Sequence, residues 1–565
     1  MNEYLAALVD ELYTLGMREV VFSAGSRSTS LAMLFTGFGK YKTYMNIDER
    51  SAAFFALGIA KRTGRPVGLV CTSGSAGTHY FPAVTEAKAS RIPLVMLTAD
   101  RPSELQFVGA PQTIDQMRLF GDFVNHFETL EGRTDDFVYP RQVAQRAVLK
   151  ALGSGSEVSG PVQINVPLRE PLVPKLDNEY FEKGRNTQAF QYIKGEMRST
   201  YTGEELAGKR GLIIAGPYNA PQGEDSATKA HHEAYGASII ALAQRLQAPV
   251  IADPLSPLRG YEDEYVIDSY DAFLVSNEVK ENLRPDYILM FGQLPVSKRV
   301  HQFLTYHKDV LTIQVDPSFE YRNGMVTTQR VIASSPIELA KSISVVNEDT
   351  SYLSLWQQEQ ASMRRQLDTV LEEPSLFEGR IVKEMQALMP KGSQIFISNS
   401  MAIRDFDYFW SKGCNEVRLF GNRGVNGIDG TESTALGMAS VGQPTVLVTG
   451  DLSFIHDMNG LIMGRQAGIS LTIVLFNNDG GGIFEYLPQK GTPYFEYLFA
   501  TPQGVDFSGL STLFGIDHEE VTSYEQFKTL LMESLNTPGI QILEIKTGRE
   551  SSCQLHRKYT VRNYE

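Results

Sequence analysis

The sequence predicts an α/β protein with three doubly wound domains, each built on a parallel β-sheet that helices cover on both faces. A chain of 565 residues is too long for one hydrophobic core. Short apolar runs of strand length alternate almost throughout with segments of helical periodicity, which is typical of buried parallel sheets. The alternation breaks at the polar segment 175–208 and again near 343–360. We therefore expect domains over residues 1–180, 205–345 and 360–565.

The first domain shows this alternation most clearly. Its apolar runs predict strands, and the segments between them have the apolar spacing of amphipathic helices. We expect strands at 19–25, 41–47, 66–74 and 92–100, and helices over 28–38, 49–62 and 76–89.

The middle and last domains repeat the scheme. We expect middle strands at 211–216, 248–253, 286–292 and 310–316, and later strands at 393–399, 416–422, 445–451, 471–478 and 540–546. The first middle strand is followed by Ala215-Gly216-Pro217-Tyr218 and not by a G-x-G-x-x-G fingerprint, so a dinucleotide site and an NAD-dependent activity are unsupported. His231 and His232 lie in a polar stretch that we interpret as a solvated loop.

Composition restricts the partners. The formal net charge is −14, so most of the surface repels nucleic acid and anionic lipid, and an anionic substrate needs a local basic cluster. The three cysteines are too few, and odd in number, for a disulfide framework, which favours a reducing compartment. The N-terminus carries acids where a signal peptide would carry Lys or Arg, and no apolar run is long enough to span a membrane. We expect a cytoplasmic protein.

Polar residues end two consecutive strands of the last domain. Gly450-Asp451 ends one strand and Asn477-Asn478 ends the next, and the 24 residues between Leu452 and Asn477 leave room for one crossover helix. Both ends then lie at the carboxyl edge of one sheet, where α/β folds bind ligands. Carboxylate and amide oxygens suit Mg²⁺ that also binds phosphate. The glycines at 480–482 allow close backbone approach, and a helix start near Ile483 favours an anion.

This pattern resembles the GDG…NN motif of thiamine diphosphate-dependent enzymes, with Leu452 in place of the third motif glycine. The resemblance implies that thiamine diphosphate is the cofactor and that Asp451, Asn478 and the backbone carbonyl of Gly480 bind Mg²⁺, with Mn²⁺ as an alternative metal. It also places Ile428, in GVNGIDG, as the bulky apolar residue that holds the cofactor bent. Its further implied cofactor contacts are Ser400, Leu452, Ser453, Ile483 and Phe484.

Glu49 opens the predicted helix that follows the second strand of the chain. A Glu at a helix start is usually explained by the helix dipole alone. The segment from Glu49 to PVGLVCTSG, however, resembles the pyrimidine-binding domain of the same family, in which this carboxyl group activates the cofactor through its aminopyrimidine ring. In that family the two halves of a site come from different subunits. The resemblance therefore implies a homodimer or a dimer of dimers.

Basic and polar residues also fall near the predicted strand ends. Each one alone is most simply a surface or salt-bridge residue, but several together in an acidic protein favour a substrate with several carboxylates, which Arg binds with two hydrogen bonds. The set is Ser26, Arg27, Arg101 and Gln112 in the first domain, Lys298 and Arg299 in the middle one, and Arg404 and Arg423 in the last.

The phrases GSRST, DERSAAF, TADRP, GAPQTIDQ, SNSMAIRDFD, NRGVNGIDG, GDLSFIHDMNGL and NNDGGGIFEYLP resemble one branch of this family, which acts in menaquinone biosynthesis. Enzymes of that branch decarboxylate 2-oxoglutarate and add the remaining four-carbon unit to isochorismate. The resemblance implies that Ser400, Arg404 and Arg423 face 2-oxoglutarate, that Ile483, Phe484 and Leu487 wall the thiazolium, and that isochorismate meets Ser26, Arg27, Arg101, Gln112, Lys298 and Arg299. The implied catalytic residues are Glu49, Arg27, Arg404 and Arg423.

Two alternatives stay open at this point. The chain could belong to another branch of the family, similar to acetolactate synthase or benzoylformate decarboxylase, because fold does not determine the reaction. It could also be a non-catalytic module that keeps the fold to bind a ligand. The retained residues Glu49, Asp451 and Asn478 favour an enzyme.

Overall fold

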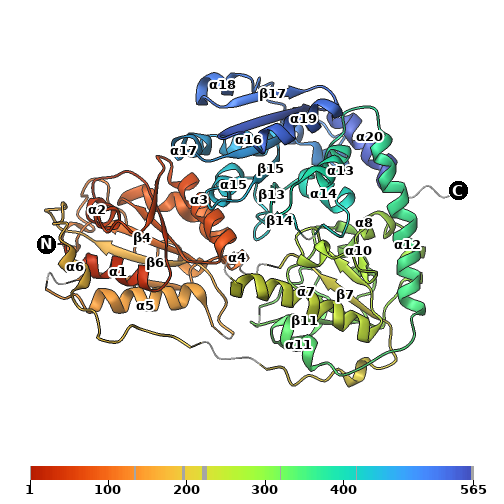
Figure 1. The fold of residues 1–565 in the computed structure, drawn as a ribbon, viewed down its shortest axis with the longest axis horizontal. Helices are drawn as coiled ribbons and strands as arrows, with labels where there is room; N and C mark the ends of the chain where they lie inside the picture. Colours follow the sequence, from red (N-terminus) through yellow and green to blue (C-terminus); the bar gives the residue numbers. More distant parts are fainter. Residues whose placement is uncertain are drawn as a thin grey trace.

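The computed structural model describes residues 2–132, 135–154, 156–193, 198–218, 226–318, 320–414 and 416–561, without the side chains of 226–229. It contains three six-stranded parallel sheets, each in its own domain, which confirms the predicted fold class (Figure 1). The sheets span residues 19–167, 211–333 and 394–546. Among the described residues, no helix has the length and apolar character needed to cross a membrane.

The first sheet has the strand order β2-β1-β3-β4-β6-β5. The predicted strands correspond to β1 (Glu19–Phe22), β2 (Lys42–Met45), β3 (Val67–Cys71) and β4 (Leu94–Asp100), whereas β5 (His126–Thr129) and β6 (Val162–Pro167) were not predicted. The helix expected over 76–89 begins as a 3₁₀ helix, η1 (Gly74–Tyr80), and becomes α-helical only in α4 (Phe81–Ser90), where Pro82 occupies the first turn. The other helices are α1 (Leu5–Thr14), α2 (Thr29–Gly37), α3 (Glu49–Thr63), α5 (Tyr139–Leu152) and α6 (Asn178–Glu182).

The middle sheet has the order β12-β11-β10-β7-β8-β9. Its edge strands β9 (Val266–Ile267) and β12 (Thr328–Ala333) were not predicted, and the other strands are β7 (Gly211–Ala215), β8 (Val250–Ala252), β10 (Tyr287–Phe291) and β11 (Leu311–Asp316). His231 and His232 lie in helix α7 (Ser226–Leu246), so the loop prediction was wrong. The same helix holds the polar stretch with these histidines and the apolar segment that follows it. The other helices are α8 (Tyr270–Phe273), α9 (Asn277–Asn282), α10 (Lys298–Tyr306) and α11 (Pro336–Ser342).

The third sheet has the order β14-β13-β15-β16-β18-β17. Its strands are β13 (Gln394–Ile397), β14 (Arg418–Phe420), β15 (Thr445–Gly450), β16 (Leu471–Asn477), β17 (Asp517–Val521, not predicted) and β18 (Ile540–Lys546). The crossover from β15 to β16 holds two short helices, α16 (Asp451–Asp457) and α17 (Gly460–Gln466), instead of the single helix expected. Between them, the Asn459 side chain donates a hydrogen bond to Asp48 of the first domain. The other helices are α13 (Glu378–Leu388), α14 (Met401–Phe409), α15 (Thr431–Ala439), α18 (Gly509–Phe514), α19 (Tyr524–Ser534) and α20 (Arg549–Thr560).

The first and third domains meet along two helices, α3 and α15, which lie side by side (Figure 1). Glycines allow the close approach: a Cβ added at Gly58 would lie 2.0 Å from the carbonyl oxygen of Thr434, and one added at Gly437 would lie 2.0 Å from that of Phe55. The long helix α12 (Ser351–Asp368) starts inside the second predicted break and runs along the outer side of the middle and third domains (Figure 1). The helix that begins with Glu49 is therefore packed directly on the domain that carries the metal motif.

Candidate active site

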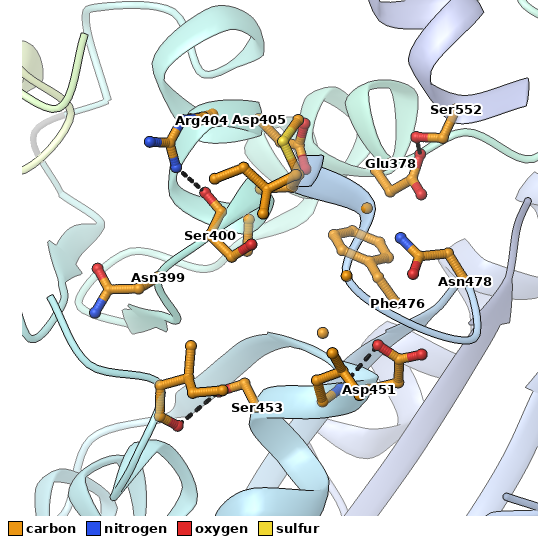
Figure 2. A pocket seen from close by; sticks show the side chains of 18 of the residues that line it. Glu378, Asn399, Ser400, Arg404, Asp405, Asp451, Ser453, Phe476, Asn478 and Ser552 are labelled. Atoms are coloured by element: carbon orange, nitrogen blue, oxygen red, sulfur yellow. Dashed lines mark hydrogen bonds between the residues drawn. The ribbon is translucent and has the colours of Figure 1, made fainter. Parts of the chain in front are cut away.

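A cavity of about 400 Å³ lies at the carboxyl edge of the third sheet (Figure 2). Because β13, β15 and β16 are parallel neighbours, the residues that follow them converge there. Every site residue predicted in the last domain except Leu487 lines it: Ser400, Arg404, Arg423, Ile428, Asp451, Leu452, Ser453, Asn478, Gly480, Ile483 and Phe484. Its volume is typical of a small-molecule site.

One end of the cavity fits a divalent metal ion. The Asp451 carboxylate accepts hydrogen bonds from the backbone N–H of Leu452 at 2.8 Å and of Gly480 at 2.6 Å. Burial raises the pKa of Asp451 to about 6, so a nearby cation would relieve an electrostatic cost. The Oδ1 atom of Asn478 is buried with no hydrogen-bond partner among the described residues. An unpartnered amide oxygen beside a buried carboxylate is a suitable oxygen pair for Mg²⁺.

No cluster of three His, Cys, Asp or Glu side chains that could hold a metal occurs in the described part of the chain. The predicted set contains one carboxylate, one amide and one backbone carbonyl. It therefore depends on phosphate oxygens and water to complete the coordination of a metal ion, as Mg²⁺ sites commonly do.

Gly480 lies where a side chain could not. Its φ is 137°, and an added Cβ would lie 2.2 Å from the carbonyl oxygen of Ala500. The α-helix expected near Ile483 is only a 3₁₀ helix, η7 (Gly482–Tyr486). Ile483 and Phe484 of this turn line the cavity, whereas Leu487 follows it and donates its backbone N–H to the carbonyl of Phe484 at 3.2 Å.

Two arginines meet at the other end of the cavity. Ser400 precedes α14 with a left-handed φ of 69°, an uncommon conformation that often marks functional sites, and Arg404 donates a hydrogen bond to its carbonyl (Figure 2). Arg423 donates to Oδ1 of Asn399 at 2.6 Å. Burial lowers the pKa of Arg423, and the guanidinium of Arg404 contributes to this lowering while Asp253 opposes it. Two neighbouring cations in a cavity are a receptor for carboxylates.

Hydrogen bonds to its backbone carbonyl hold Ile428 in the cavity wall. Its carbonyl accepts hydrogen bonds from the hydroxyl groups of Ser453 at 3.0 Å and Thr431 at 3.1 Å. The start of α16 and the start of α15 thus fix the loop from which the Ile428 side chain projects.

The cavity wall nearest α20 contains residues that the sequence did not predict. Asp405, next to Arg404, receives a hydrogen bond of 2.5 Å from Nε2 of His556. Burial raises the pKa of Asp405 to about 6. Burial alone would lower the pKa of His556, but Asp405 raises it above its usual value. Asp405 falls inside the SNSMAIRDFD phrase, whereas α20 has no motif that could have predicted its place. The missed wall also includes Glu378, Tyr486, Arg549 and Ser552.

The residues predicted in the first domain form a second group at the carboxyl edge of its sheet. Arg27 is buried and donates to the Leu168 carbonyl at 2.8 Å. Its pKa is lowered by burial and then by the neighbouring charge of Arg101. Gln112 has a φ of 56° and donates to the Ser73 carbonyl at 3.2 Å. Ser26 is exposed beside Arg27.

Glu49 also belongs to the first domain, where it is the first residue of α3. Asp48 caps this helix by accepting a hydrogen bond of 3.2 Å from the N–H of Ser51. Glu49 is half-buried and lines a separate cavity of about 500 Å³, together with Ile47, Asp48, Arg50, His79, Asn459 and Ile462. Within one chain, Glu49 and Asp451 therefore line different cavities.

Lys298 and Arg299 begin α10 in the middle domain, where Ser297 caps the helix. Neither lines the cavity of Asp451. Lys298 is exposed, and Arg299 is half-buried with a hydrogen bond of 3.1 Å to Gln302.

Models of three protein families match the chain in sequence. They are described as "Thiamine pyrophosphate enzyme, N-terminal TPP binding domain" over residues 3–119, "Middle domain of thiamine pyrophosphate" over 187–397, and "Thiamine pyrophosphate enzyme, C-terminal TPP binding domain" over 412–545.

Several curated relatives carry the name 2-succinyl-5-enolpyruvyl-6-hydroxy-3-cyclohexene-1-carboxylate synthase. One from Lactococcus lactis subsp. cremoris is 56% identical and covers 99% of both chains. Relatives from Desulfitobacterium hafniense and Bacillus velezensis are 48% and 41% identical; each matches 99% of this chain, and 100% and 96% of their own. Among solved structures, benzoylformate decarboxylase from Polynucleobacter necessarius superposes with a TM-score of 0.72 over 97% of this chain and 98% of its own. Its sequence identity is 16%, so it supports the fold only.

Proposed function

The chain belongs to the thiamine pyrophosphate enzyme family and, within it, to the 2-succinyl-5-enolpyruvyl-6-hydroxy-3-cyclohexene-1-carboxylate synthases, and from this premise we propose that it makes that compound and CO₂ from 2-oxoglutarate and isochorismate in menaquinone biosynthesis. The observation that carries the proposal is 56% identity over 99% of both chains to a relative with that name. The alternative of a benzoylformate-decarboxylase-like branch has a fold likeness at 16% identity as its support.

The third-domain cavity is the place for the cofactor's diphosphate in this proposal. Bound thiamine diphosphate supplies a nucleophilic carbon and an electron sink for loss of CO₂ from a 2-oxo acid. Asp451, Asn478 and the carbonyl of Gly480 would hold Mg²⁺, or Mn²⁺ in its place. Ile428, the bulky apolar residue assigned to hold the cofactor bent, would contact it together with Leu452 and Ser453, which line the same cavity.

The basic residues of the site would bind the four carboxylates of the two substrates. Arg404 and Arg423, with Ser400, lie in the cavity and are assigned to 2-oxoglutarate. Ile483 and Phe484 line the cavity and, with Leu487 that follows them in the chain, are assigned as the apolar wall that would keep water from the reacting carbon. The residues assigned to isochorismate are Ser26, Arg27, Arg101, Gln112, Lys298 and Arg299.

A complete site needs a second copy of the chain in this proposal, because Glu49 and Asp451 line different cavities of one chain. Large apolar side chains stand exposed around the first-domain group, as expected for a surface that another chain covers. Ile47 is 74% exposed and Phe107 is 85% exposed, and Met45, Val108 and Met117 are exposed as well. We propose a homodimer, or a dimer of such dimers, in which Glu49 of one chain faces Asp451 of the other.

The proposal also includes a cytoplasmic location. Cys71, Cys414 and Cys553 are all free thiols, the state that a reducing compartment maintains.

The test mixes purified protein with thiamine diphosphate, Mg²⁺, 2-oxoglutarate and isochorismate and follows the absorbance of isochorismate. We expect consumption that requires all four components. Turnover of 2-oxoglutarate or pyruvate with isochorismate left unchanged would contradict the proposal and support another branch of the family.

Glu49→Gln distinguishes an enzyme from a module that only binds the cofactor. The variant replaces the carboxyl group with an amide of the same size that cannot exchange a proton with the cofactor, so we expect activity to fall about 100-fold or more, while calorimetry still detects binding of Mg²⁺ and thiamine diphosphate. A wild-type protein that binds the cofactor and converts no 2-oxo acid would be a binding module.

A further inference from the structure

A buried carboxylate, Asp271 of α8, joins two helices that carry the substrate-binding cations. Its Oδ1 atom accepts a hydrogen bond from the hydroxyl of Ser297, and its Oδ2 atom accepts one from the hydroxyl of Tyr408. Asp271 is 8% exposed and Ser297 is 3% exposed. Both carboxylate oxygens therefore have a partner, and each partner belongs to a different helix.

Ser297 connects this carboxylate to the start of α10. Its hydroxyl oxygen caps the helix by accepting a hydrogen bond of 3.1 Å from the N–H of Val300. The next two residues are Lys298 and Arg299. The cap and the bond to Asp271 thus fix the first turn of α10, from which both cations project.

Tyr408 connects the same carboxylate to α14. It lies four residues after Arg404, and residues at this spacing share one face of a helix. The charge of Arg299 acts on the pKa of Tyr408, which burial and then Asp271 raise far above its usual value. Burial lowers the pKa of His301, on which the charges of Asp271, Arg423 and Arg404 also act. Arg299 of α10 and Arg404 of α14 thus each act electrostatically on a group that the charge of Asp271 also reaches.

A second tyrosine–aspartate hydrogen bond joins α8 to α14, and here the donor lies in α8 and the acceptor in α14. Tyr270 donates to Oδ1 of Asp407 at 2.6 Å. Each helix thus contributes a Tyr-Asp or Asp-Tyr pair, and each tyrosine bonds to the aspartate of the other helix. Asp407 lies 3.8 Å from the buried guanidinium of Arg259, whereas Asp271 bonds to the cap of α10.

We propose that Asp271 is a positioning residue for the substrates, because through Ser297 and Tyr408 it holds Lys298 and Arg299 in a fixed arrangement with Arg404. This inference rests on the proposed function for the identity of the substrates. It concerns affinity for substrate carboxylates, since misplaced cations weaken binding of an oriented dianion. The cofactor end of the cavity is not involved.

The test compares two isosteric variants. Tyr408→Phe and Tyr270→Phe each remove one buried hydroxyl that bonds to a carboxylate between the same two helices, and only the first breaks the link to α10. We expect Tyr408→Phe to raise the KM for isochorismate roughly 3- to 10-fold with a much smaller change in kcat. Tyr270→Phe should leave this KM near the wild-type value and lower the melting temperature to a similar extent.

Ser297 provides a conservative rescue. Ser297→Ala should raise the KM as Tyr408→Phe does, whereas Ser297→Thr keeps a hydroxyl and a helix cap and should stay near wild type. Because both bonds end on Asp271, the double variant Ser297→Ala/Tyr408→Phe should raise the KM by less than the product of the single effects.

Hydrogen exchange of the holoenzyme gives a readout that does not need turnover. Amides of residues 299–302 should exchange faster in Tyr408→Phe than in Tyr270→Phe. Equal effects of the two variants on the KM and on exchange, or no effect of either, would overturn the inference. Failure of the wild-type enzyme to consume isochorismate would contradict the proposed function and leave the exchange comparison to decide the inference.

Discussion

At the residue scale, local chemistry explains why the sequence predicts where the residues proposed to bind a metal lie in the fold. Asp451 and Asn478 end adjacent parallel strands, and the glycine at 480 accommodates a φ of 137° with the Ala500 carbonyl close by. Each property follows from a residue type at a strand end. The partner of Asp405 could not be predicted in this way, since His556 lies 151 positions further along the chain.

Asp457 provides a prediction at this scale. It is buried at the end of α16, accepts a hydrogen bond of 2.7 Å from the N–H of Ser433, and has its pKa raised by burial to about 7. The folded state thus keeps a proton that the unfolded state releases above pH of about 4. Stability should therefore fall as pH rises from about 4 to 7, by on the order of 1 kcal/mol per pH unit.

Asp457→Asn removes this titration and keeps the acceptor oxygen. We expect the variant to be more stable than wild type by a larger margin at pH 8 than at pH 5, as measured by the unfolding midpoint at both pH values. Asp517→Asn, at an exposed position of β17, is the control. A stability difference that stays the same at the two pH values would contradict the assigned pKa.

At the scale of elements, the crossing of α3 and α15 holds the first and third domains together. The sequence predicts α3, but its contact with α15 depends on backbone atoms approaching across the interface at Gly58 and Gly437. A single sequence contains no signal for such a contact. A glycine inside a helix lowers helix stability by about 1 kcal/mol, and the sequence does not show whether a close helix contact compensates for this loss.

Gly437→Ala tests this crossing. The new methyl group would lie 2.0 Å from the carbonyl oxygen of Phe55, so the helices must separate, and we expect a loss of about 1–3 kcal/mol in unfolding free energy despite the better helix propensity of Ala. Gly509→Ala is the matched control, because a Cβ at Gly509 in α18 meets nothing within 4 Å. Equal thermal stability of the two variants would show that the helices do not need this close contact.

At the scale of the whole molecule, one chain carries two half-sites on two different sheets. The proposed dimer predicts that two inactive variants can complement each other. In a mixed dimer of Glu49→Gln and Asp451→Ala chains, one site carries both substitutions and the other carries neither. Mixed dimers isolated with two affinity tags should have about half the wild-type activity, although each parent homodimer is nearly inactive.

The control for this experiment is a mixed dimer of wild-type chains with the same two tags. If the purified mixed dimer of variants were no more active than its parents, the site would have to be built within a single chain.

The sequence by itself determined the fold class, the three sheets and the residues that end their central strands, because apolar periodicity and strand-end chemistry are local properties. It missed the interior strand β6 and the edge strands β5, β9, β12 and β17. The edge strands are short or only partly apolar and depend on a neighbouring strand for their pairing. It also predicted Glu49, Arg404 and Lys298 as members of one site without their arrangement. Only the tertiary structure decided that Glu49 and Asp451 line separate cavities of one chain, that α20 completes one wall of the cavity, and that Asp271 of α8 bonds to the cap of α10. These contacts join residues far apart in sequence, whose side chains meet only after the domains pack.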